Sequence, residues 1–454
     1  MRMTVIGTGY VGTVHAACMA DIGHQVLGID IDAERIASLS AGRAPIHESG
    51  LDELLARTVA SGRLRFSTSL AEGAAFARTH FMCVGTPQRP DSKAADLRYV
   101  DAVVDGLAPH LRPGSLIVGK STVPVGTAAR LAERLAETAP DTEVAWNPEF
   151  LREGSAVQDT MRPERLVVGV TSRHAEAVLR AVYTRMILDG VPFFCTDPAT
   201  AELVKVAANS FLATKISFIN AMAEVCDTAG ADASVLARAI GADSRIGPRF
   251  LEPGLGFGGS CFPKDIRAFA ARAEEIGAGE AVVFLHEVDR INTRQRSRAV
   301  DRARRLLGGS FTGRRIAVLG AAFKPGSDDV RDSPALAVAA ALHQQGAEVR
   351  VHDPQAVDNA RAAHPELAYA LDIDKACEDA DLVLHLTNWP EYQDIDPAAL
   401  AALVRSPVLL DARNSLDPRS WSAAGWAVHA PGRPRLSSTT PSKAKAAALT
   451  GGAS

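Results

Sequence analysis

The sequence lacks the features that would place it in a membrane, a disulfide-rich class or a metal-binding class. No apolar run reaches the ~18 residues of a membrane-spanning helix. The six cysteines are scattered without a Cys-x-x-Cys pair, which favours free thiols in a reducing compartment. The twelve histidines show no spacing typical of metal ligands, so we predict no metal.

Charge of neither sign dominates the chain. The net charge is -4 and the pI is near 6.3, so nothing indicates nucleic acid or a membrane surface as a partner. An apolar strand begins almost at Met1, which predicts no signal peptide. We therefore expect a cytoplasmic protein with a small-molecule partner, and the 454 residues allow two or three domains.

The chain opens with a glycine motif in a setting typical of dinucleotide-binding domains. Residues 3–12 read Met-Thr-Val-Ile-Gly-Thr-Gly-Tyr-Val-Gly, which is an apolar strand followed by Gly-x-Gly-x-x-Gly. A helical pattern follows over 11–22, and a second strand over 25–30 ends at Asp30. This strand–helix–strand context is the one that the dinucleotide fingerprint requires.

Each part of this motif has a physical role. Gly7 forms the tight turn, Gly9 admits the pyrophosphate, and Gly12 lets the helix and strand pack closely. The helix N-terminus offers N–H groups and a partial positive charge to the phosphates. Asp30 is placed to bind the ribose hydroxyls and to repel a 2′-phosphate, so the sequence predicts NAD in preference to NADP.

A second glycine-rich segment carries a cysteine. Residues 256–265 read Gly-Phe-Gly-Gly-Ser-Cys-Phe-Pro-Lys-Asp. Taken alone, this segment is a glycine turn that opens a helix, with a small buried cysteine and a surface Lys–Asp pair. Beside a redox cofactor the functional interpretation is favoured, in which Lys264 promotes the reactive thiolate of Cys261 and Asp265 positions or deprotonates water.

Three polar residues follow apolar strands in the first half of the chain. Thr86, Thr122 and Glu149 each come just after a strand and close to a proline. Each one alone is typical of a turn or a cap. Ligands of open α/β sheets bind at the carboxyl ends of strands, so we interpret the three together as walls of a site.

The pattern changes to helix near residue 200. The stretch 201–228 has no Gly or Pro, and Lys205 and Asn209 share one face because they are four residues apart. Since their neighbours are apolar, Lys205 either extends its charge into water or serves the site, and the helix alone leaves both open. A second long helix over 281–307 becomes basic after Arg290, and we interpret that end as a solvated face or a subunit contact.

From about Phe311 the chain returns to alternating strands and helices. Residues 315–326 and 348–354 resemble the opening strand and turn and the strand that ends at Asp30, but the second and third glycines are absent. Lys324 stands in the turn instead and Arg413 follows a later strand; both are suited to phosphate through a side chain. After about Arg435, Ser, Thr, Lys, Ala and Gly dominate, which predicts a disordered tail.

These patterns predict an α/β protein with two Rossmann-like domains of parallel sheets, joined by a long central helix in an all-α region. The predicted limits are 1–196 for the N-terminal NAD-binding domain, 197–308 for the helical region, 309–435 for the C-terminal domain and 436–454 for the tail.

A series of motifs resembles the UDP-glucose/GDP-mannose dehydrogenase family over residues 1–435. They are Gly-Thr-Gly-Tyr-Val-Gly at 7–12, Val-Gly-Thr-Pro at 84–87, Ser-Thr-Val-Pro-Val-Gly-Thr at 121–127, Asn-Pro-Glu-Phe-Leu-Arg-Glu-Gly at 147–154, Lys205-x-x-x-Asn209, Gly-Gly-Ser-Cys-Phe-Pro-Lys-Asp at 258–265, Phe-Lys at 323–324 and Asp-Asp-Val-Arg-Asp-Ser at 328–333. The resemblance implies NAD as cofactor, a central helix for homodimerisation and a C-terminal domain for the UDP-sugar.

The resemblance also implies the chemistry, a four-electron oxidation of UDP-glucose to UDP-glucuronate with two NAD. Cys261 attacks the intermediate aldehyde, and the thiohemiacetal is oxidised to a thioester that water hydrolyses. Lys205 and Asn209 are implied to stabilise the oxyanion, Asp265 and Thr122 to assist alcohol deprotonation, and Glu149 to act as the base in hydrolysis.

Binding residues are carried over in the same way. The implied cofactor contacts are Gly7, Gly9, Tyr10, Val11, Gly12, Asp30, Arg35, Thr86, Thr122, Glu153, Lys264 and Arg331. The implied substrate contacts are Glu149, Phe150, Leu151, Arg152, Lys205, Asn209, Arg245, Phe250, Leu251, Glu252, Pro253, Gly254, Gly258, Lys324 and Arg413. Arg245 matches a family arginine that can reach the substrate of the neighbouring subunit.

Two alternatives stay open at this point. One is GDP-mannose or another nucleotide sugar as the substrate within the same family. The other is a two-electron NAD dehydrogenase of the 6-phosphogluconate or 3-hydroxyacyl type, which shares the N-terminal domain and a long helix. Those enzymes have neither a cysteine in the glycine-rich loop nor a further Rossmann-like domain, so Cys261 and Lys324 distinguish the two classes.

Overall fold

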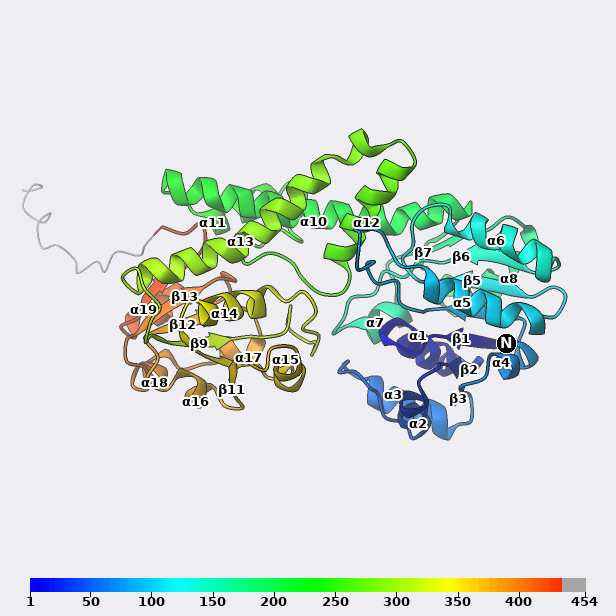
Figure 1. Ribbon diagram of the computed structural model, residues 1–454, viewed down its shortest axis with the longest axis horizontal. Coiled ribbons are helices and arrows are strands. Elements are labelled where there is room, and N and C mark those ends of the chain that lie inside the picture. The colour runs from blue at the N-terminus through cyan, green and yellow to red at the C-terminus, as the bar shows by residue number, and fades with distance from the viewer. Residues whose placement is uncertain (435–454) are drawn as a thin grey trace, which may run out of the picture.

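Two α/β lobes stand side by side and are bridged by long helices (Figure 1). The computed structural model describes residues 1–434, so the predicted tail at 436–454 lies outside the described residues. An eight-stranded sheet forms the N-terminal lobe and a six-stranded sheet forms the C-terminal lobe. The predicted fold class, two Rossmann-like units with a long central helix, is confirmed.

The strand order of the N-terminal sheet is β3-β2-β1-β4-β5-β6-β7-β8, and its first six strands have the order typical of dinucleotide-binding domains. The strands are β1 Arg2–Ile6, β2 Gln25–Ile29, β3 Leu64–Ser67, β4 Thr79–Met82, β5 Leu116–Gly119, β6 Glu143–Trp146, β7 Leu166–Gly169 and β8 Phe193–Thr196. They are parallel, except that β7 is antiparallel to β6 at the pair Trp146 and Gly169. Since β4, β5 and β6 are parallel neighbours, Thr86, Thr122 and Glu149 come after strands that end at the same edge.

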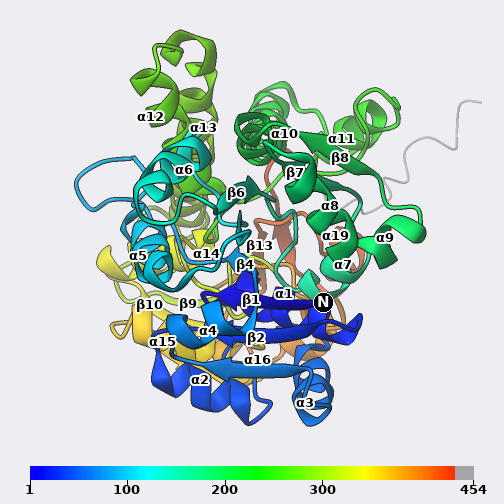
Figure 2. The same ribbon diagram turned by 90° about the vertical axis from the view of Figure 1, so that its right-hand side faces the viewer.

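Helices cover both faces of this sheet (Figure 2). They are α1 Tyr10–Asp21, α2 Ala33–Ser40, α3 Leu51–Ala60, α4 Leu70–Phe76, α5 Arg98–Leu107, the 3-10 turn η1 Ala108–His110, α6 Thr127–Thr138, α7 Ala156–Met161, α8 Arg173–Val182 and α9 Thr184–Leu188. Side chains alternate along a strand, so Leu116 and Val118 of β5 enter one apolar core and Ile117 enters the other. Both faces are therefore buried, which explains why these strands read as continuous apolar runs.

The central helices are α10 Pro198–Ala229, α11 Ala233–Gly241, α12 Phe262–Glu275, the 3-10 turn η2 Gly279–Val282 and α13 Phe284–Leu306. The 32-residue helix α10 is about 48 Å long. Asp197 caps its N-terminus by accepting from the Thr200 N–H, Pro198 occupies the first turn, and Gly230 ends it in the left-handed conformation. The predicted helix at 201–228 is thus confirmed, whereas 281–307 divides into η2 and α13.

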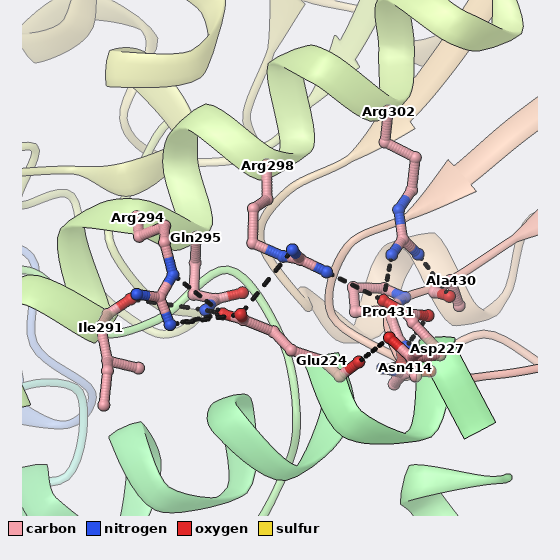
Figure 3. Close-up of polar contacts among 12 residues, drawn as sticks. Glu224, Asp227, Ile291, Arg294, Gln295, Arg298, Arg302, Asn414, Ala430 and Pro431 are labelled. Carbon is pink, nitrogen blue, oxygen red and sulfur yellow. Dashed lines mark hydrogen bonds and ion pairs between the residues drawn. The ribbon is translucent and has the colours of Figure 1, made fainter.

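The basic end of α13 is engaged within the chain and is not a solvated face. Arg294 and Arg298 pair with Glu224 of α10, and Arg298 and Arg302 pair with Asp227 (Figure 3). The arginines are four residues apart, so they share one face of α13. This face of α13 is therefore tied to α10 by ion pairs.

In the C-terminal lobe all six strands are parallel, in the order β11-β10-β9-β12-β13-β14. The elements are β9 Arg315–Leu319, α14 Pro334–Gln344, β10 Glu348–His352, α15 Val357–Ala363, β11 Ala368–Ala370, α16 Ile373–Cys377, β12 Leu382–His385, α17 Pro390–Gln393, α18 Pro397–Ala401, β13 Val408–Asp411, α19 Pro418–Ala423 and β14 Ala427–His429. Ala299, Val300 and Ala303 of α13 belong to the core of this lobe. The predicted domain limits fall in the connections beside α10 and α13 and stay predictions.

The place that corresponds to Asp30 is filled by protein in the C-terminal lobe. Asp353 follows β10 as Asp30 follows β2, but it is 3% exposed. Its Oδ2 accepts from the Ala321 and Ala322 N–H groups at 2.7 and 2.9 Å, and from the Trp389 indole at 3.0 Å. Because the Trp389 indole and two backbone N–H groups already bind this oxygen, Asp353 is not free to bind the ribose hydroxyls of a dinucleotide.

Candidate active site

The opening glycine motif has the geometry of a dinucleotide cradle. A Cβ on Gly12 would stand 1.8 Å from the Gly7 carbonyl oxygen, so only glycine fits where α1 meets β1. A Cβ on Gly9 would meet nothing within 4 Å, which leaves the backbone open on that side. Tyr10 and Val11 begin α1, whose N–H groups face this opening. These residues fit the pyrophosphate of a dinucleotide.

The Asp30 carboxylate, just after β2, is fixed by hydrogen bonds. Its Oδ2 accepts from the Thr8 N–H at 2.8 Å and from Arg35 Nη1 at 3.1 Å. Burial raises the pKa of the Asp30 carboxyl, but the backbone N–H groups of Asp32 and Thr8, together with Arg35, bring the pKa below its usual value. The ionised carboxylate suits the hydroxyls of a ribose and opposes a phosphate. This geometry fits NAD, and it brings the two predicted residues Asp30 and Arg35 together.

Cys261 stands at the start of α12, at the end of the glycine-rich loop. The loop packs tightly against the C-terminal lobe. A Cβ on Gly258 would stand 2.3 Å from the Asp332 carbonyl oxygen, and one on Gly259 would stand 2.7 Å from the Phe323 ring. The predicted requirement for glycine here is therefore explained by close contact with the other lobe, in addition to any approach of a ligand.

Lys205 of α10 is buried and does not extend into water. Its Nζ lies 3.0 Å from Glu149 Oε1, and the two side chains are 6% and 9% exposed. Burial lowers the pKa of Lys205, but the carboxylates of Glu149 and Asp265 raise it above the ordinary lysine value. A buried ammonium held beside Cys261 can stabilise negative charge on a reacting oxygen.

Asn209 lies one turn further along α10 and contacts a second carboxylate. Its Nδ2 donates to Asp265 Oδ2 at 2.8 Å, and Lys264 Nζ lies 2.5 Å from Asp265 Oδ1. Asp265 is only 2% exposed. Asn209 and the predicted pair Lys264–Asp265 therefore form one network between α10 and α12.

These residues line two adjoining spaces. A cavity of about 440 Å³ reaches Cys261, Lys205, Asn209 and Glu149, and it is also lined by Val11, Phe150, Leu151, Arg152 and Phe250. A much smaller space of about 20 Å³ is lined by Thr86, Thr122, Lys264 and Asp265. The Asn209–Asp265 hydrogen bond joins a residue of the first space to a residue of the second. Thr86 Oγ1 also donates to the Thr122 carbonyl at 2.7 Å.

The protonation of Cys261 differs from the expectation based on Lys264 alone. Burial raises the pKa of the thiol, and the carboxylates of Asp265 and Glu149 raise it further. Lys205 and Lys264 act in the opposite direction without reversing this result. In the ligand-free protein the two carboxylates and the low polarity outweigh the two cations, so Cys261 holds its proton more firmly than an exposed cysteine.

Glu153 connects the N-terminal lobe to the cysteine loop and to the C-terminal lobe. It accepts from Ser260 Oγ at 2.9 Å, and Arg331 Nη2 lies 3.9 Å from it. Burial and then the charge of Asp329 raise the pKa of Glu153 to about 7, while the Ser260 hydrogen bond opposes the rise. Two buried carboxylates close together explain the direction of this shift.

Comparisons with known proteins decide the family. Three models of the UDP-glucose/GDP-mannose dehydrogenase family match in order, namely its NAD binding domain over 1–187, its central domain over 199–294 and its UDP binding domain over 317–418. UDP-glucose 6-dehydrogenase TuaD of Bacillus subtilis (strain 168) is 42% identical over 97% of this chain and 95% of that protein. The chain belongs to the UDP-glucose/GDP-mannose dehydrogenase family.

Two further relatives agree with this family membership. The UDP-glucose 6-dehydrogenase of Rhizobium meliloti (strain 1021) is 42% identical over 96% of this chain and 100% of that protein. The solved UDP-glucose dehydrogenase of the hyperthermophilic archaeon Pyrobaculum islandicum is 41% identical, with a TM-score of 0.86 over 92% of this chain and 95% of that one. The resemblance predicted from the motifs, and NAD as the family cofactor, are confirmed.

Several residues predicted from the family motifs already have protein partners. Arg245 is exposed and pairs with Asp243, Arg152 pairs with Asp159, and Arg331 pairs with Asp329. Glu252 is exposed, whereas Leu251, Pro253 and Gly254 are buried, and the Gly254 N–H donates to Asn220 Oδ1. Binding roles for these residues stay predictions.

Arg413 and Lys324 both stand between the lobes of this family member. The Arg413 guanidinium donates to the carbonyls of Leu386, Gly256 and Phe323 at 2.6, 3.0 and 3.4 Å, and burial lowers its pKa to about 10. Lys324 is half-buried beside the Phe323 ring, and burial lowers its pKa while Glu153 opposes the change. Arg413 thus braces the glycine-rich loop from the C-terminal lobe.

Some site residues were missed by sequence reasoning. Glu48 is 5% exposed and accepts a hydrogen bond from the Tyr10 hydroxyl. It also accepts from the Gly154 and Ala156 N–H groups at 2.7 and 2.8 Å, which holds the 154–156 turn. Lys120 is 7% exposed and donates to Asn147 Oδ1 at 3.0 Å on the wall of the large cavity. Glu48 stands in a segment without a recognisable motif, whereas Lys120 could have been noticed as a cation that ends a buried strand.

Within residues 1–434 no group of three or more His, Cys, Asp or Glu side chains is arranged to hold a metal ion. Over the same range no helix is long and apolar enough to cross a membrane.

Proposed function

We propose that this protein oxidises UDP-glucose to UDP-glucuronate as a UDP-glucose 6-dehydrogenase. The observation that carries the proposal is the meeting of Cys261, Lys205, Asn209 and Glu149 around one cavity, with Lys205 and Glu149 buried as an ion pair. A thiol is unnecessary for a two-electron alcohol oxidation, but it provides a covalent route from the aldehyde to the acid. Relatives named UDP-glucose 6-dehydrogenase, about 40% identical over nearly the whole chain, support the choice of sugar nucleotide.

NAD accepts a hydride when it is bound. The residues that would hold it are Gly7, Gly9 and Gly12 at the pyrophosphate and Asp30 at the ribose, because their geometry fits those groups. Thr86, Thr122 and Lys264 line the small space beside Asp265, which supports their assignment to the cofactor side. Glu153 and Arg331 are proposed to close that side from the inter-lobe contact.

In the first oxidation the C6 hydroxyl of the sugar loses its proton and a hydride leaves the carbon. We assign the proton transfer to Asp265, with Thr122 holding a water, because Asp265 is buried among Asn209 and Lys264. The Lys264 ammonium and the Asn209 amide hold the Asp265 carboxylate in place. The product of this step is the aldehyde.

In the second stage Cys261 Sγ bonds to the aldehyde carbon, and the carbonyl electron pair moves to its oxygen. Lys205 and Asn209 stabilise that negative oxygen from one face of α10. Loss of a hydride from the resulting thiohemiacetal leaves a thioester on Cys261. Because the pKa of the thiol is raised in the ligand-free protein, its proton has to leave as the C–S bond forms, and we propose that it passes to water in the cavity.

Hydrolysis then releases the acid. Glu149 is proposed to take a proton from water, whose oxygen attacks the thioester carbon, and the C–S bond breaks to restore the Cys261 thiol. Glu149 is held for this role by Lys205 on Oε1 and by the Leu151 N–H on Oε2 at 2.7 Å. Thioester hydrolysis makes the whole reaction effectively irreversible.

The proposed stoichiometry separates this reaction from the alternatives. We expect two NADH for each UDP-glucose consumed, with UDP-glucuronate as the product identified by mass spectrometry. One NADH per sugar with a free aldehyde would place the protein with two-electron dehydrogenases. Faster turnover of GDP-mannose than of UDP-glucose would instead change the substrate and keep the mechanism.

A homodimer is proposed from an exposed apolar stripe on α10. Phe211, Phe218 and Val225 are seven residues apart and 66%, 48% and 57% exposed, so they share one uncovered face. A second copy of this helix is the proposed occupant, which would bring Arg245 towards the partner's substrate. Light scattering should give twice the monomer mass, and Phe218→Asp should give the monomer mass.

We also propose that the protein acts in the cytoplasm. All six cysteines, including Cys261, are free thiols, which suits a reducing compartment.

A further inference from the structure

One buried residue of α13 holds the backbone of the cysteine loop on both sides. Asn292 is 1% exposed. Its Oδ1 accepts from the Phe257 N–H at 2.8 Å and its Nδ2 donates to the Phe257 carbonyl at 2.9 Å. A Cβ on Gly256 would stand 2.3 Å from Asn292 Oδ1, so the loop is pressed directly against this side chain. Cys261 follows four residues after Phe257.

One turn further along α13, Arg296 holds the opposing loop. Its Nη1 lies 2.8 Å from Asp332 Oδ1, and the Arg296 side chain is 18% exposed. Asp332 has a positive φ of 46°, a conformation that non-glycine residues seldom adopt without support. The Arg296 ion pair supplies such support at the end of the 328–333 loop. Asn292 and Arg296 are four residues apart, so both project from one face of α13.

The two loops held by α13 also touch each other. The Gly259 N–H donates to the Arg331 carbonyl at 3.0 Å, and a Cβ on Gly258 would overlap the Asp332 carbonyl oxygen at 2.3 Å. Arg413 donates to the Gly256 carbonyl from the far side. The backbone before Cys261 is therefore located by groups from α13 and from the C-terminal lobe.

We propose that Asn292 and Arg296 are positioning residues that set the location of the Cys261 thiol by holding the 256–259 and 328–333 loops together. This proposal rests on the proposed function for the importance of Cys261 in turnover. Neither residue contacts the thiol, and each acts through a loop backbone. A buried amide that satisfies both backbone polar groups of one residue, and so holds the peptide units on either side of it, fixes that residue more firmly than a single contact.

The same helix offers a matched control on another face. Arg294 donates to Glu224 of α10 at 3.1 and 3.2 Å and Gln295 donates to it at 2.8 Å (Figure 3). Arg294→Ala removes polar contacts of α13 with α10 and leaves Asn292 in place. It therefore reports the effect of loosening the helix alone.

The test measures how fast iodoacetamide alkylates Cys261 in the full-length, ligand-free protein, followed by peptide mass spectrometry. The exposed Cys195 serves as the internal reference. Loss of both Asn292 hydrogen bonds in Asn292→Ala is expected to raise the Cys261 rate about tenfold or more, since the loop opens more often. Arg296→Ala is expected to raise it less, and Arg296→Lys to restore part of the protection because it keeps the ion pair. Arg294→Ala should leave the rate within twofold.

Two outcomes would overturn the proposal. One is a wild-type alkylation rate in Asn292→Ala, and the other is an equal increase in Arg294→Ala. If Asn292→Ala does not fold, Asn292→Asp is decisive, because it keeps the acceptor for the Phe257 N–H and loses the donor. It should then raise the rate, and a wild-type rate would overturn the proposal. The alkylation measurement needs no sugar nucleotide, so it remains a valid test even if UDP-glucose is not the substrate.

Discussion

Replacing Cys261 with alanine is expected to lower the rate of UDP-glucuronate formation by about 10⁴-fold or more, because no other group supplies the covalent bond. Binding of UDP-glucose should change little, since the thiol bonds to carbon only after the aldehyde forms. Measurements of NADH yield and of the equilibrium dissociation constant for UDP-glucose separate these two effects. Full acid formation by Cys261→Ala would remove the cysteine from the mechanism. The segment around Cys261 would then be only a glycine turn that opens a helix.

Replacing Cys261 with serine tests the same position, because a covalent intermediate should accumulate on the protein. A serine hydroxyl is a poorer nucleophile here, and an ester releases its acyl group more slowly than a thioester. A covalent sugar-nucleotide adduct should therefore build up after incubation with UDP-glucose and NAD, and intact-protein mass spectrometry would detect its added mass. Cys195→Ser is the control, since Cys195 lies exposed on β8 away from the cavity.

Replacing Lys205 with methionine is expected to reduce kcat by about 10²–10³-fold, because the developing oxyanion loses its cationic donor. The change also leaves Glu149 buried without its partner, and we expect a loss of about 3–5 kcal/mol in the free energy of unfolding. Denaturant melts and steady-state kinetics with UDP-glucose measure the two effects separately.

The double variant Lys205→Met with Glu149→Gln distinguishes stability from catalysis. With both charges removed, most of the lost stability should return, because no unpaired ion remains in the interior. Activity should stay low, since oxyanion stabilisation and the hydrolytic base are both missing. Recovery of kcat together with stability would show that Lys205 serves the fold alone.

The sequence predicted most of the residues that the structure brings together at the candidate site, because these residues come in local patterns. The spacing of Lys205 and Asn209 placed both on one helix face, and the strand ends placed Thr122 and Glu149 at one sheet edge. That Lys205 is paired to Glu149 and not directed into water depends on the packing of α10 against the N-terminal sheet. No spacing within either segment contains that information.

The missed residues act across long distances in the chain. Asn292 contacts Phe257 thirty-five positions away, and Glu48 contacts Gly154 across 106 positions. A signal for Asn292 does exist, because it is an amide among the buried positions 285, 288, 292, 295 and 299 of α13, where Gln295 is the other amide. A polar residue within such a helical stripe needs a partner, although the sequence does not say which one.

The filled pocket at Asp353 has a consequence for the order of events in turnover. The Asp30 carboxylate of the N-terminal sheet accepts from the Thr8 N–H, whereas the Asp353 carboxylate of the C-terminal sheet also accepts from the Trp389 indole. In the proposed four-electron oxidation two hydrides leave one sugar, so NADH would have to be exchanged for NAD at this one site before the product is complete. The half-oxidised sugar must wait through that exchange, and its covalent attachment to Cys261 would keep a reactive aldehyde from diffusing away.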